Sequence, residues 1–402
     1  MIAKIEKSTP RGEISAPPSK SMAHRMLICA GLAQGESIIH NVADSDDILA
    51  TLGCLSSLGA VCVRDGNTVR ITGIDIASAH STEPLFCNES GSTLRFFVPL
   101  CLMSGARFTL MGSNTLFSRP LGVYEKICAE QGIAFERYNS SLSVSGTLAS
   151  GEYRVEGNIS SQFISGLLFV LPLCRHDSRI SIIPPIESRS YLNLTIETLA
   201  LFGVDVRWQD DKTLYIKGGQ HYTPAELVVE GDYSNSSFFD ALNLFGGDVT
   251  VKGLNPNSLQ GDRAYAEYFG MLTRGTPTIH IGNCPDLGPI LMAVAAAKNG
   301  AVFCGTRRLK IKESDRGAVM AEELAKFGAK VTVNEDSIAV YSQGLHAPSE
   351  NLCGHNDHRI VMSLSTLLTV TGGVIEGAEA VRKSLPEYFD ILKSLGVSVT
   401  MT

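Results

Sequence analysis

A short pattern that returns about every 70 residues constrains the fold of this chain most strongly. In each copy a helical stretch ends at a glycine, which is followed by alternating apolar residues and a polar turn. The glycines of the pattern are Gly59, Gly132, Gly203, Gly328 and Gly396. The longer gap between Gly203 and Gly328 leaves room for one further, shortened copy. The sequence therefore predicts six related units.

Four of the copies continue from the glycine into a predicted β-hairpin, over residues 61–71, 133–144, 204–216 and 331–340. Each of these segments alternates apolar and polar residues around a polar turn such as Asp65-Gly66-Asn67. The fourth copy, around 268–281, lacks most of the hairpin, and the sixth reaches Thr402 before completing it.

A polar cluster leads into an apolar helix in every copy. The clusters lie at residues 19–21, 89–92, 160–162, 234–237, 285–286 and 356–359. The helices that follow them are apolar all round, as over 163–173 and 291–297, which is typical of helices buried on nearly all sides. Each unit is thus predicted to run strand, helix, strand, helix and hairpin. Because 402 residues exceed one typical core, we expect two α/β domains of three units each.

The polar clusters indicate a site for anions. Within one domain the buried helices can lie parallel, which gathers their partly positive N-termini at one end. In the first cluster Ser19 is a good N-cap, a helix begins at about Lys20, and Ser21 and Arg25 lie on one face of it. An ordinary solvated helix start is the alternative for this stretch. For 234–237, which has no basic residue nearby in the sequence, we interpret the polar side chains as helix caps alone.

Further candidates lie outside these clusters. Arg119 is held at a loop end by Pro120, and Ser188 lies in a polar loop before a helix. The segment from Lys312 to Arg316 is predicted to open a helix that runs to Phe327, so that two cations occupy its first turn. Such cations oppose the helix dipole unless an anion binds there. The alternative is a surface ion pair between Glu313 and Arg316, which would stabilise the helix little.

Two basic or histidine-containing segments complete the set. His355 and His358 could be taken as a metal-binding pair, but the remaining ligands of such a site are absent, and the segment is one of the polar clusters. Arg382-Lys383 precedes the final helix. Neither a glycine-rich phosphate loop with Lys nor a Gly-x-Ser-x-Gly nucleophile turn occurs, which disfavours nucleotide and acyl-enzyme chemistry.

Composition and charge limit the partners and the compartment. The formal net charge of −7, with dispersed Lys and Arg, argues against a nucleic-acid surface. None of the ten cysteines forms a Cys-x-x-Cys pair, and most lie in apolar runs, which is typical of buried thiols in a reducing compartment. The first residues lack the pattern of a signal peptide, and no apolar run is long enough to cross a membrane. We therefore expect a cytoplasmic protein without membrane partners.

The order and spacing of these motifs resemble the family of 5-enolpyruvylshikimate-3-phosphate synthases, 3-phosphoshikimate 1-carboxyvinyltransferases within the enolpyruvyl transferases. The resemblance runs from about Gly12 to Phe389. It rests on Ser19-Lys20-Ser21 with Arg25, Gly91 to Arg95, Arg119-Pro120, Ser160-Ser161-Gln162, Lys312-Glu313-x-Asp315-Arg316, Asp357-His358-Arg359 and Lys383 before Pro386. The chain departs from the family's usual pattern at Pro18, at Glu89-Ser90 and at Arg308.

The resemblance implies an inside-out α/β barrel in each of two domains, with six βαβαββ repeats, buried helices and outer sheets. One domain is expected over residues 16–230. The other is expected to combine 1–15 with 231–402 and to contain the shortened fourth repeat. The family precedent is a monomer.

The resemblance also implies a reaction and a set of site residues. The family transfers the enolpyruvyl group of phosphoenolpyruvate to the 5-hydroxyl of shikimate 3-phosphate, by addition and elimination through a tetrahedral intermediate. Expected phosphoenolpyruvate ligands are Lys20, Gly91, Arg119, Gln162, Arg316, Arg359 and Lys383. Expected shikimate 3-phosphate ligands are Lys20, Ser21, Arg25, Ser160, Ser161, Gln162, Ser188, Asp286 and Lys312. Asp286, Glu313 and Lys20 are the expected proton-transfer groups, and neither a metal nor an organic cofactor is implied.

Two other readings remain open at this stage. The sister enzyme that transfers enolpyruvyl to UDP-N-acetylglucosamine shares the fold, but it normally carries a reactive cysteine where this chain has the cysteine-free segment 113–120. A binding protein without catalysis is the second alternative. The presence of Asp286, Glu313 and Lys20 argues against it, because binding alone needs no proton-transfer groups.

Overall fold

The computed structural model describes residues 1–402. The chain divides into two compact units, each with its own hydrophobic core. We call Pro18–Glu230 the central unit, and Met1–Pro17 together with Gly231–Thr402 the terminal unit. The chain thus passes from one unit to the other at Pro17–Pro18 and at Glu230–Gly231, within about two residues of the expected boundaries.

The central unit contains three four-stranded sheets of one design. Their strand orders are β14-β3-β5-β4, β6-β7-β9-β8 and β10-β11-β13-β12, and in each the first pair is parallel while the last three strands are antiparallel. The bounds are β3 (Glu36–His40), β4 (Val61–Asp65), β5 (Thr68–Thr72), β6 (Leu85–Phe86), β7 (Arg107–Met111), β8 (Ala134–Arg137), β9 (Ser141–Ser145), β10 (Glu152–Glu156), β11 (Ser178–Ile183), β12 (Val206–Trp208), β13 (Thr213–Ile216) and β14 (Glu226–Val228). The three hairpins expected in this part of the chain are confirmed.

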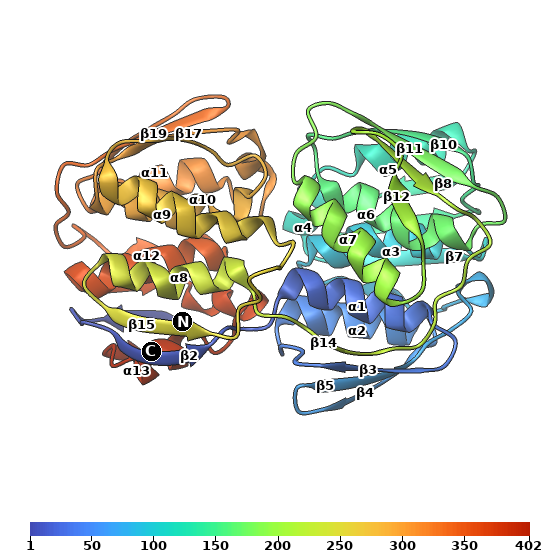
Figure 1. Ribbon diagram of the computed structural model, residues 1–402, viewed down its shortest axis with the longest axis horizontal. Helices are drawn as coiled ribbons and strands as arrows, with labels where there is room; N and C mark the ends of the chain where they lie inside the picture. Colours follow the sequence, from blue (N-terminus) through green and yellow to red (C-terminus); the bar gives the residue numbers. More distant parts are fainter. The chain divides into compact units, whose positions relative to one another are not determined.

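Three helices of the central unit lie inside its sheets (Figure 1). The helices α1 (Lys20–Leu32), α3 (Gly91–Cys101) and α6 (Ser161–Val170) are buried on nearly all sides, as their composition predicts. By contrast, α2 (Asp46–Ser57), α5 (Gly122–Glu130) and α7 (Arg189–Leu201) each bury one face. Shorter helices are η1 (Ile76–Ser78), α4 (Asn114–Ser118) and η2 (Leu171–Leu173).

Serine caps begin all three buried helices of this unit. The hydroxyls of Ser19, Ser90 and Ser160 accept hydrogen bonds from the backbone N–H groups of Met22, Thr93 and Gln162. Each cap satisfies one of the N–H groups that a helix start leaves without a partner, so these polar clusters mark the helix starts that the sequence predicts.

The terminal unit contains two sheets of the same design and one reduced sheet. The orders are β16-β17-β19-β18, β20-β21-β1-β22 and the parallel pair β15-β2. The bounds are β1 (Ile2–Ile5), β2 (Arg11–Ser15), β15 (Asp248–Lys252), β16 (Thr278–His280), β17 (Ala301–Cys304), β18 (Lys330–Val333), β19 (Ser337–Tyr341), β20 (Leu352–Cys353), β21 (Gly373–Glu376) and β22 (Val399–Met401). The fourth repeat has no hairpin, because the chain runs from α9 (Tyr265–Arg274) directly into β16 of the next sheet.

The N-terminal strand completes the sixth sheet. β1 lies between β21 and β22 and pairs with both in antiparallel register, Ala3 facing Ile375 on one side and Met401 on the other. It occupies the place that the second hairpin strand has in the other four-stranded sheets. Figure 1 shows this blue segment beside the red end of the chain.

The helices of the terminal unit repeat the arrangement of the central one. The helices α8 (Tyr233–Leu244), α10 (Gly288–Ala297) and α12 (His358–Thr371) are the buried ones, and α9, α11 (Arg316–Lys326) and α13 (Tyr388–Ser394) each bury one face. Short 3₁₀ helices are η3 (Gly261–Ala264), η4 (Pro285–Leu287), η5 (Arg307–Ile311) and η6 (Ala378–Lys383). The prediction that a helix opens at Lys312 is wrong: α11 begins at Arg316, because the Asp315 carboxylate caps it through the N–H of Ala318.

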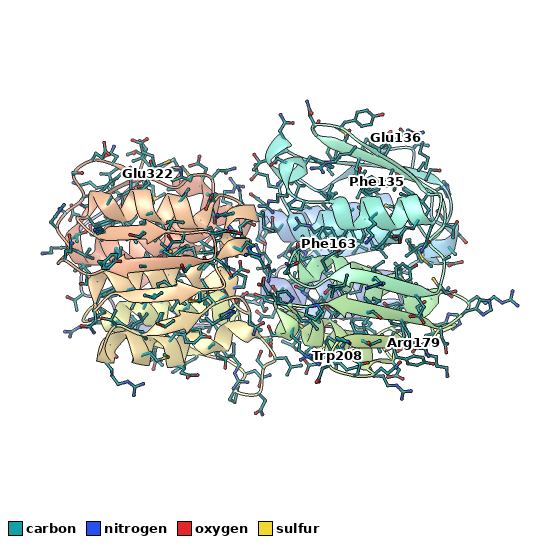
Figure 2. All side chains as sticks on the ribbon, turned by 90° about the horizontal axis from the view of Figure 1, so that it is seen from above. Phe135, Glu136, Phe163, Arg179, Trp208 and Glu322 are labelled. Carbon is teal, nitrogen blue, oxygen red and sulfur yellow. The ribbon has the colours of Figure 1, made fainter.

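Side-chain positions follow this inside-out plan. Phe163 of α6 is fully buried in the central unit, whereas Glu136 and Arg179 are exposed on strands β8 and β11 (Figure 2). A membrane-spanning helix would need a longer continuous apolar stretch than any helix of this chain provides.

Candidate active-site clusters

Lys20 in the first turn of α1 has a carboxylate partner on the neighbouring helix. Its Nζ lies 2.8 Å from Oδ2 of Asp47 in α2, and the two side chains are only 14% and 12% exposed. The ion pair holds the ammonium group beside the N-terminus of α1. Sequence reasoning missed Asp47, although two consecutive acidic residues, Asp46 and Asp47, are typical of the first turn of a helix.

Arg25 is buried one turn further along α1 and is held by several acceptors. Its Nη1 donates to the Ser21 carbonyl (2.7 Å), its Nε to Oγ1 of Thr195 (2.8 Å) and its Nη2 to the Tyr191 carbonyl (3.2 Å). Burial lowers the pKa of Arg25 to about 10, so the guanidinium stays charged at neutral pH.

The start of α7 adds Ser188 to the same region. Ser188 is buried, has a left-handed backbone with φ 56°, and precedes the α7 residues Tyr191 and Thr195 that contact Arg25. The structure therefore brings the expected residues Ser21, Arg25 and Ser188 to one region of the central unit.

A second group in the central unit surrounds Gly91 at the N-terminus of α3. A β-carbon at Gly91 would lie 2.7 Å from Nη1 of Arg119 and 3.2 Å from Nη1 of Arg95, so a larger residue here would push at least one guanidinium group aside. Oε1 of Gln162 accepts from Nη1 of Arg95 (2.6 Å), and its Nε2 donates to Oγ of Ser92 (2.8 Å). Arg95, which has no role among the expected site residues, thus fixes the orientation of the Gln162 amide.

Ser160 and Ser161 are buried at the N-terminus of α6, next to Gln162. Oγ of Ser160 accepts from the N–H of Gln162 at 3.3 Å. The central unit therefore gathers helix N-termini, hydroxyls and the cations Arg95 and Arg119, which together suit anionic ligands.

Asp286 lies at the centre of the corresponding group in the terminal unit. Its Oδ1 is 3.0 Å from Nζ of Lys312 and 2.7 Å from Nη1 of Arg316, and its Oδ2 is 3.7 Å from Nη2 of Arg359. Burial alone would raise the pKa of Asp286, but the cations Lys312, Arg359 and Arg316 outweigh it and hold that pKa well below its usual range. Asp286 is therefore ionised.

Arg316 is held by three carboxylates. Its Nε and Nη2 contact both oxygens of Asp357 at 2.8 and 3.2 Å, and Nη2 also lies 2.6 Å from Oε2 of Glu313. The Arg316 side chain is 1% exposed and that of Glu313 18%, so the interpretation of this contact as a surface ion pair is wrong. Breaking a buried pair leaves an uncompensated charge, which costs far more than losing a surface pair.

Burial also acts on Lys312, whose pKa it lowers despite the nearby Asp286 carboxylate. Arg308, a departure from the family's pattern, is buried and lowers the same pKa through charge repulsion.

Arg359 in the first turn of α12 contacts the polar start of α8. Its Nη1 donates to Oγ of Ser234 at 2.6 Å and to the Asp286 carbonyl at 3.3 Å. The interpretation of 234–237 as helix caps without a basic partner is therefore wrong, because the partner comes from a residue 125 positions away in the chain. Nζ of Lys383 in η6 donates to the Asn356 carbonyl at 2.5 Å, one residue before Asp357.

The two histidines of the discounted metal motif have separate environments. His355 bonds to Glu323 of α11, while His358 is buried in α12. A buried carboxylate that the sequence analysis did not single out is Asp262 in η3. Burial, with repulsion from Asp286, raises the pKa of Asp262 to about 6.

The geometry joins proton-transfer groups to anion-binding groups. Asp286 and Glu313 share the guanidinium of Arg316, which would hold a phosphate or carboxylate close to two carboxylates able to accept and return protons. The sequence signal for Asp357 was present in the motif Asp357-His358-Arg359, but its pairing with Arg316 depends on the packing of α11 against α12.

Comparisons with a family model and with curated proteins identify the same family. The family model described as EPSP synthase (3-phosphoshikimate 1-carboxyvinyltransferase) matches residues 5–392. A protein named 3-phosphoshikimate 1-carboxyvinyltransferase from Clostridium perfringens (strain ATCC 13124) is 38% identical, over 98% of this chain and 97% of its own length. One of the same name from Clostridium kluyveri is 39% identical, over 96% and 95% of the two chains.

Solved structures agree on the fold. An EPSP synthase structure from Acinetobacter baumannii covers 100% of this chain and 99% of its own with a TM-score of 0.80, at 21% identity. The enolpyruvyl transferase NikO from Streptomyces tendae covers 100% and 98%, also with a TM-score of 0.80, at 14% identity. At these identities the likeness shows the fold, including the two-domain α/β arrangement.

Proposed function

This chain belongs to the EPSP synthase family, and we propose that it transfers the enolpyruvyl group of phosphoenolpyruvate to the 5-hydroxyl of shikimate 3-phosphate through the residues described above. The reaction releases phosphate and belongs to the shikimate pathway, which leads to chorismate and the aromatic amino acids.

The central unit supplies most of the proposed contacts to shikimate 3-phosphate. Arg25 remains charged although buried, and the α6 start offers two hydroxyls beside helix N–H groups, a combination that suits a phosphate monoester. The proposed ligands in this unit are Lys20, Ser21, Arg25, Ser160, Ser161, Gln162 and Ser188. For phosphoenolpyruvate they are Lys20, Gly91, Arg119 and Gln162.

The terminal unit supplies the remaining proposed contacts and the proton transfers. Arg316, Arg359 and Lys383 are proposed to bind phosphoenolpyruvate, and Asp286 and Lys312 the shikimate hydroxyls. The observation that carries this assignment is the ionised Asp286 carboxylate among three cations, with Glu313 on the same Arg316 guanidinium.

These groups account for both halves of the reaction. In the addition, the 5-oxygen bonds to C2 of phosphoenolpyruvate, its proton passes to Asp286, and C3 gains a proton from Glu313 or Lys20. In the elimination, that methyl group returns a proton and the C2–O bond to phosphate breaks. Anionic substrates that share Lys312, Arg316 and Arg359 with Asp286 would raise the pKa of its carboxyl and make it a stronger base.

The proposal also covers the cellular compartment, the oligomeric state and the binding partners. We propose a cytoplasmic monomer whose partners are small molecules. The support is the net charge of −7 and the ten free cysteines, seven of them buried.

The test is phosphate release from phosphoenolpyruvate with shikimate 3-phosphate or with UDP-N-acetylglucosamine as acceptor. We expect release only with shikimate 3-phosphate, and a fall in kcat of roughly 100-fold or more in Glu313→Ala and in Asp286→Asn. Glu335→Gln is the matched control, since Glu335 is exposed and its ion partner is Arg307 on the surface of the same unit.

Each other outcome points to a different conclusion. Release with UDP-N-acetylglucosamine would favour the sister activity. Release with neither acceptor, while calorimetry still detects binding of both substrates, would favour a binding protein without catalysis. Full activity in both variants would remove Asp286 and Glu313 from the mechanism.

A further inference from the structure

Helix α11 contacts the segment Cys353–Asp357 at two points, and only one of them belongs to the proposed mechanism. At its first residue Arg316 pairs with Asp357. Two turns later Glu323 projects from the same helix toward the other end of the segment, and its side chain is 0% exposed. We call Cys353–Asp357 the α12 entry loop, because α12 begins directly after it.

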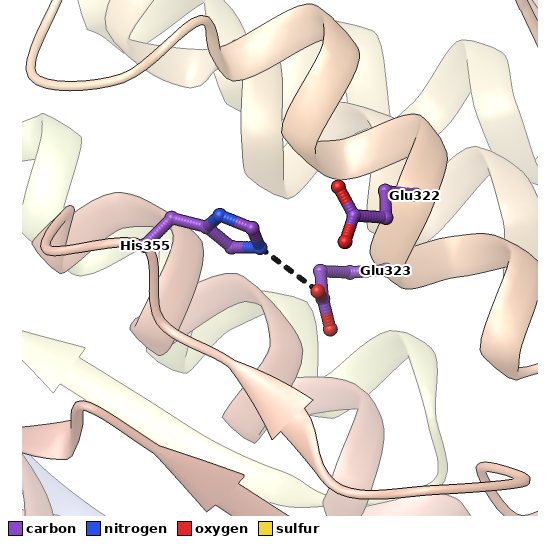
Figure 3. A group of neighbouring side chains, drawn as sticks. All are labelled: Glu322, Glu323 and His355. Carbon is purple, nitrogen blue, oxygen red and sulfur yellow. Dashed lines mark hydrogen bonds and ion pairs between the residues drawn. The ribbon is translucent and has the colours of Figure 1, made fainter.

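Glu323 receives hydrogen bonds from the start of this loop. Its Oε2 accepts from the N–H of Cys353 at 3.0 Å, and its Oε1 from Nε2 of His355 at 2.9 Å and from Nζ of Lys326 at 3.0 Å (Figure 3). Nζ of Lys326 also donates to the Asn351 carbonyl at 3.2 Å, just before the loop. A buried carboxylate with these donors is expensive to remove, because the donors would be left without an acceptor.

The entry loop needs such support because its backbone is strained. His355 and Asn356 are consecutive residues in the left-handed region, with φ of 47° and 54°. For residues with a side chain this conformation is unfavourable compared with ordinary backbone, and it persists where surrounding contacts enforce it. The Glu323 contacts act directly on His355 and on the residue two positions earlier.

The strained residues set the position of groups in the proposed site. The Asn356 carbonyl accepts from Nζ of Lys383, and Asp357 both caps α12 and pairs with Arg316. Arg359 follows in the first turn of α12. A shift of the entry loop would therefore move Lys383, Arg316 and Arg359, the proposed phosphoenolpyruvate ligands of this unit. Of the proposed shikimate 3-phosphate ligands only Asp286 and Lys312 belong to this unit, and the shift would reach them indirectly, through the contacts of Asp286 with Arg316 and Arg359.

The same group could be considered as a metal site. Ligand atoms of Glu322, Glu323 and His355 lie within 4.8 Å of one another (Figure 3). However, the Lys326 ammonium already lies 3.0 Å from Oε1 of Glu323, and Oε2 is bonded to the N–H of Cys353. A metal ion would have to displace a cation from a carboxylate that is already bonded, so the charges favour an anchor made of hydrogen bonds.

We propose that Glu323 is a positioning residue that fixes the α12 entry loop in its strained conformation and thereby pre-orders the phosphoenolpyruvate ligands Arg316, Arg359 and Lys383. The inference rests on the proposed function of those three residues. It assigns Glu323 no contact with substrate.

The first experiment compares Glu323→Ala with the neighbouring exposed change Glu322→Gln, using initial rates of phosphate release. We expect the KM for phosphoenolpyruvate to rise about tenfold or more in Glu323→Ala, and the KM for shikimate 3-phosphate to rise clearly less, because most of its proposed ligands lie in the central unit. Glu322→Gln should match the wild type. Circular dichroism and thermal unfolding confirm that each variant is folded.

The second experiment asks whether the strain is the cause. In the Glu323→Ala background His355 has already lost its bond to Glu323, so His355→Gly removes only the cost of the left-handed backbone. We expect the double variant to recover most of the wild-type KM for phosphoenolpyruvate, which a loss of overall stability would not produce. If Glu323→Ala does not fold, Glu323→Leu with and without His355→Gly provides the same comparison, because Leu fills the space and cannot accept a hydrogen bond from His355.

Several results would overturn the proposal. They are an unchanged KM for phosphoenolpyruvate in a folded Glu323→Ala, an equal rise for both substrates, or no recovery with His355→Gly. A change in the wild-type KM on adding EDTA or Zn²⁺ would replace the anchor by a metal site. A wild type that transfers nothing would refute the proposed function instead, and calorimetric binding of phosphoenolpyruvate would then test the anchor by itself.

Discussion

Single residues in the terminal unit show how a buried charged group is kept stable. Asp286, Glu313 and Asp357 surround the guanidinium of Arg316, so three carboxylates compensate the charge of that buried cation. The arrangement leaves Lys312 and Arg359 with contacts to Asp286 that anionic ligands could share. Asp262 differs from these carboxylates, because burial dominates its environment.

Asp262 leads to a prediction about stability and pH. Its folded pKa of about 6 lies above the ordinary value of an unfolded Asp, 3.8. Between those values the folded state binds more protons than the unfolded state, so the contribution of Asp262 to stability falls as pH rises from about 4 to about 6 and stays low above that. Asp262→Asn should therefore stabilise the protein at pH 7.5 by an amount on the order of 2 kcal/mol.

Urea unfolding of wild type and Asp262→Asn at pH 7.5 and pH 4.5 measures this effect. The gain should be clearly smaller at pH 4.5, where Asp262 is protonated in the folded wild type. A gain that is independent of pH, or a loss at pH 7.5, would contradict the assigned cause.

At the scale of elements, the reduced sheet of the fourth repeat stands apart from the other five. β2 pairs with β15 alone, and most of its residues are exposed, whereas β17 and β21 are each paired on both sides. A sheet of only two strands, joined by a single set of backbone hydrogen bonds, is less stable than a sheet of three or more strands.

Hydrogen exchange should reveal this difference. We expect the backbone amides of β2 and β15 to exchange at least about tenfold faster than those of β17 and β21, because local opening of a two-stranded ladder breaks fewer contacts. Exchange followed by mass spectrometry at neutral pH measures all four strands in one sample. Equal protection in the four strands would show that the reduced sheet opens only with the whole unit.

At the scale of the whole molecule, the path of the chain ties its two ends together. The N–H of Ile2 donates to the Thr402 carbonyl at 2.8 Å, and β1 fills the central place in the sixth sheet. The cysteines are distributed through both cores, and only Cys353 is exposed, while Cys62 and Cys304 are partly buried.

This distribution predicts the thiol reactivity of the native chain. At pH 8 a disulfide reagent such as DTNB should modify about one thiol per chain rapidly, and all ten only after unfolding, because burial raises the pKa of thiols such as Cys29 and Cys101 and blocks access to them. Cys353→Ser should abolish the rapid phase. A rapid phase that persists in that variant would show that another cysteine is accessible.

The sequence by itself determined the features that depend on neighbours in the chain. The repeat number, the hairpins at 61–71 and 331–340, the apolar helices and the serine caps all follow from short-range periodicity and from capping chemistry. The shortened fourth repeat was also visible, because a missing hairpin is a missing local pattern.

Only the tertiary structure decided which charges meet. Lys20 finds Asp47 on the next helix, Arg316 pairs with Asp357 across 41 positions, and Arg359 reaches Ser234 across 125. The Glu323 anchor and the insertion of β1 into the last sheet likewise join distant segments. Such contacts depend on how helices and strands pack against one another. The periodicity of one segment does not reveal which residues of a distant segment will contact it.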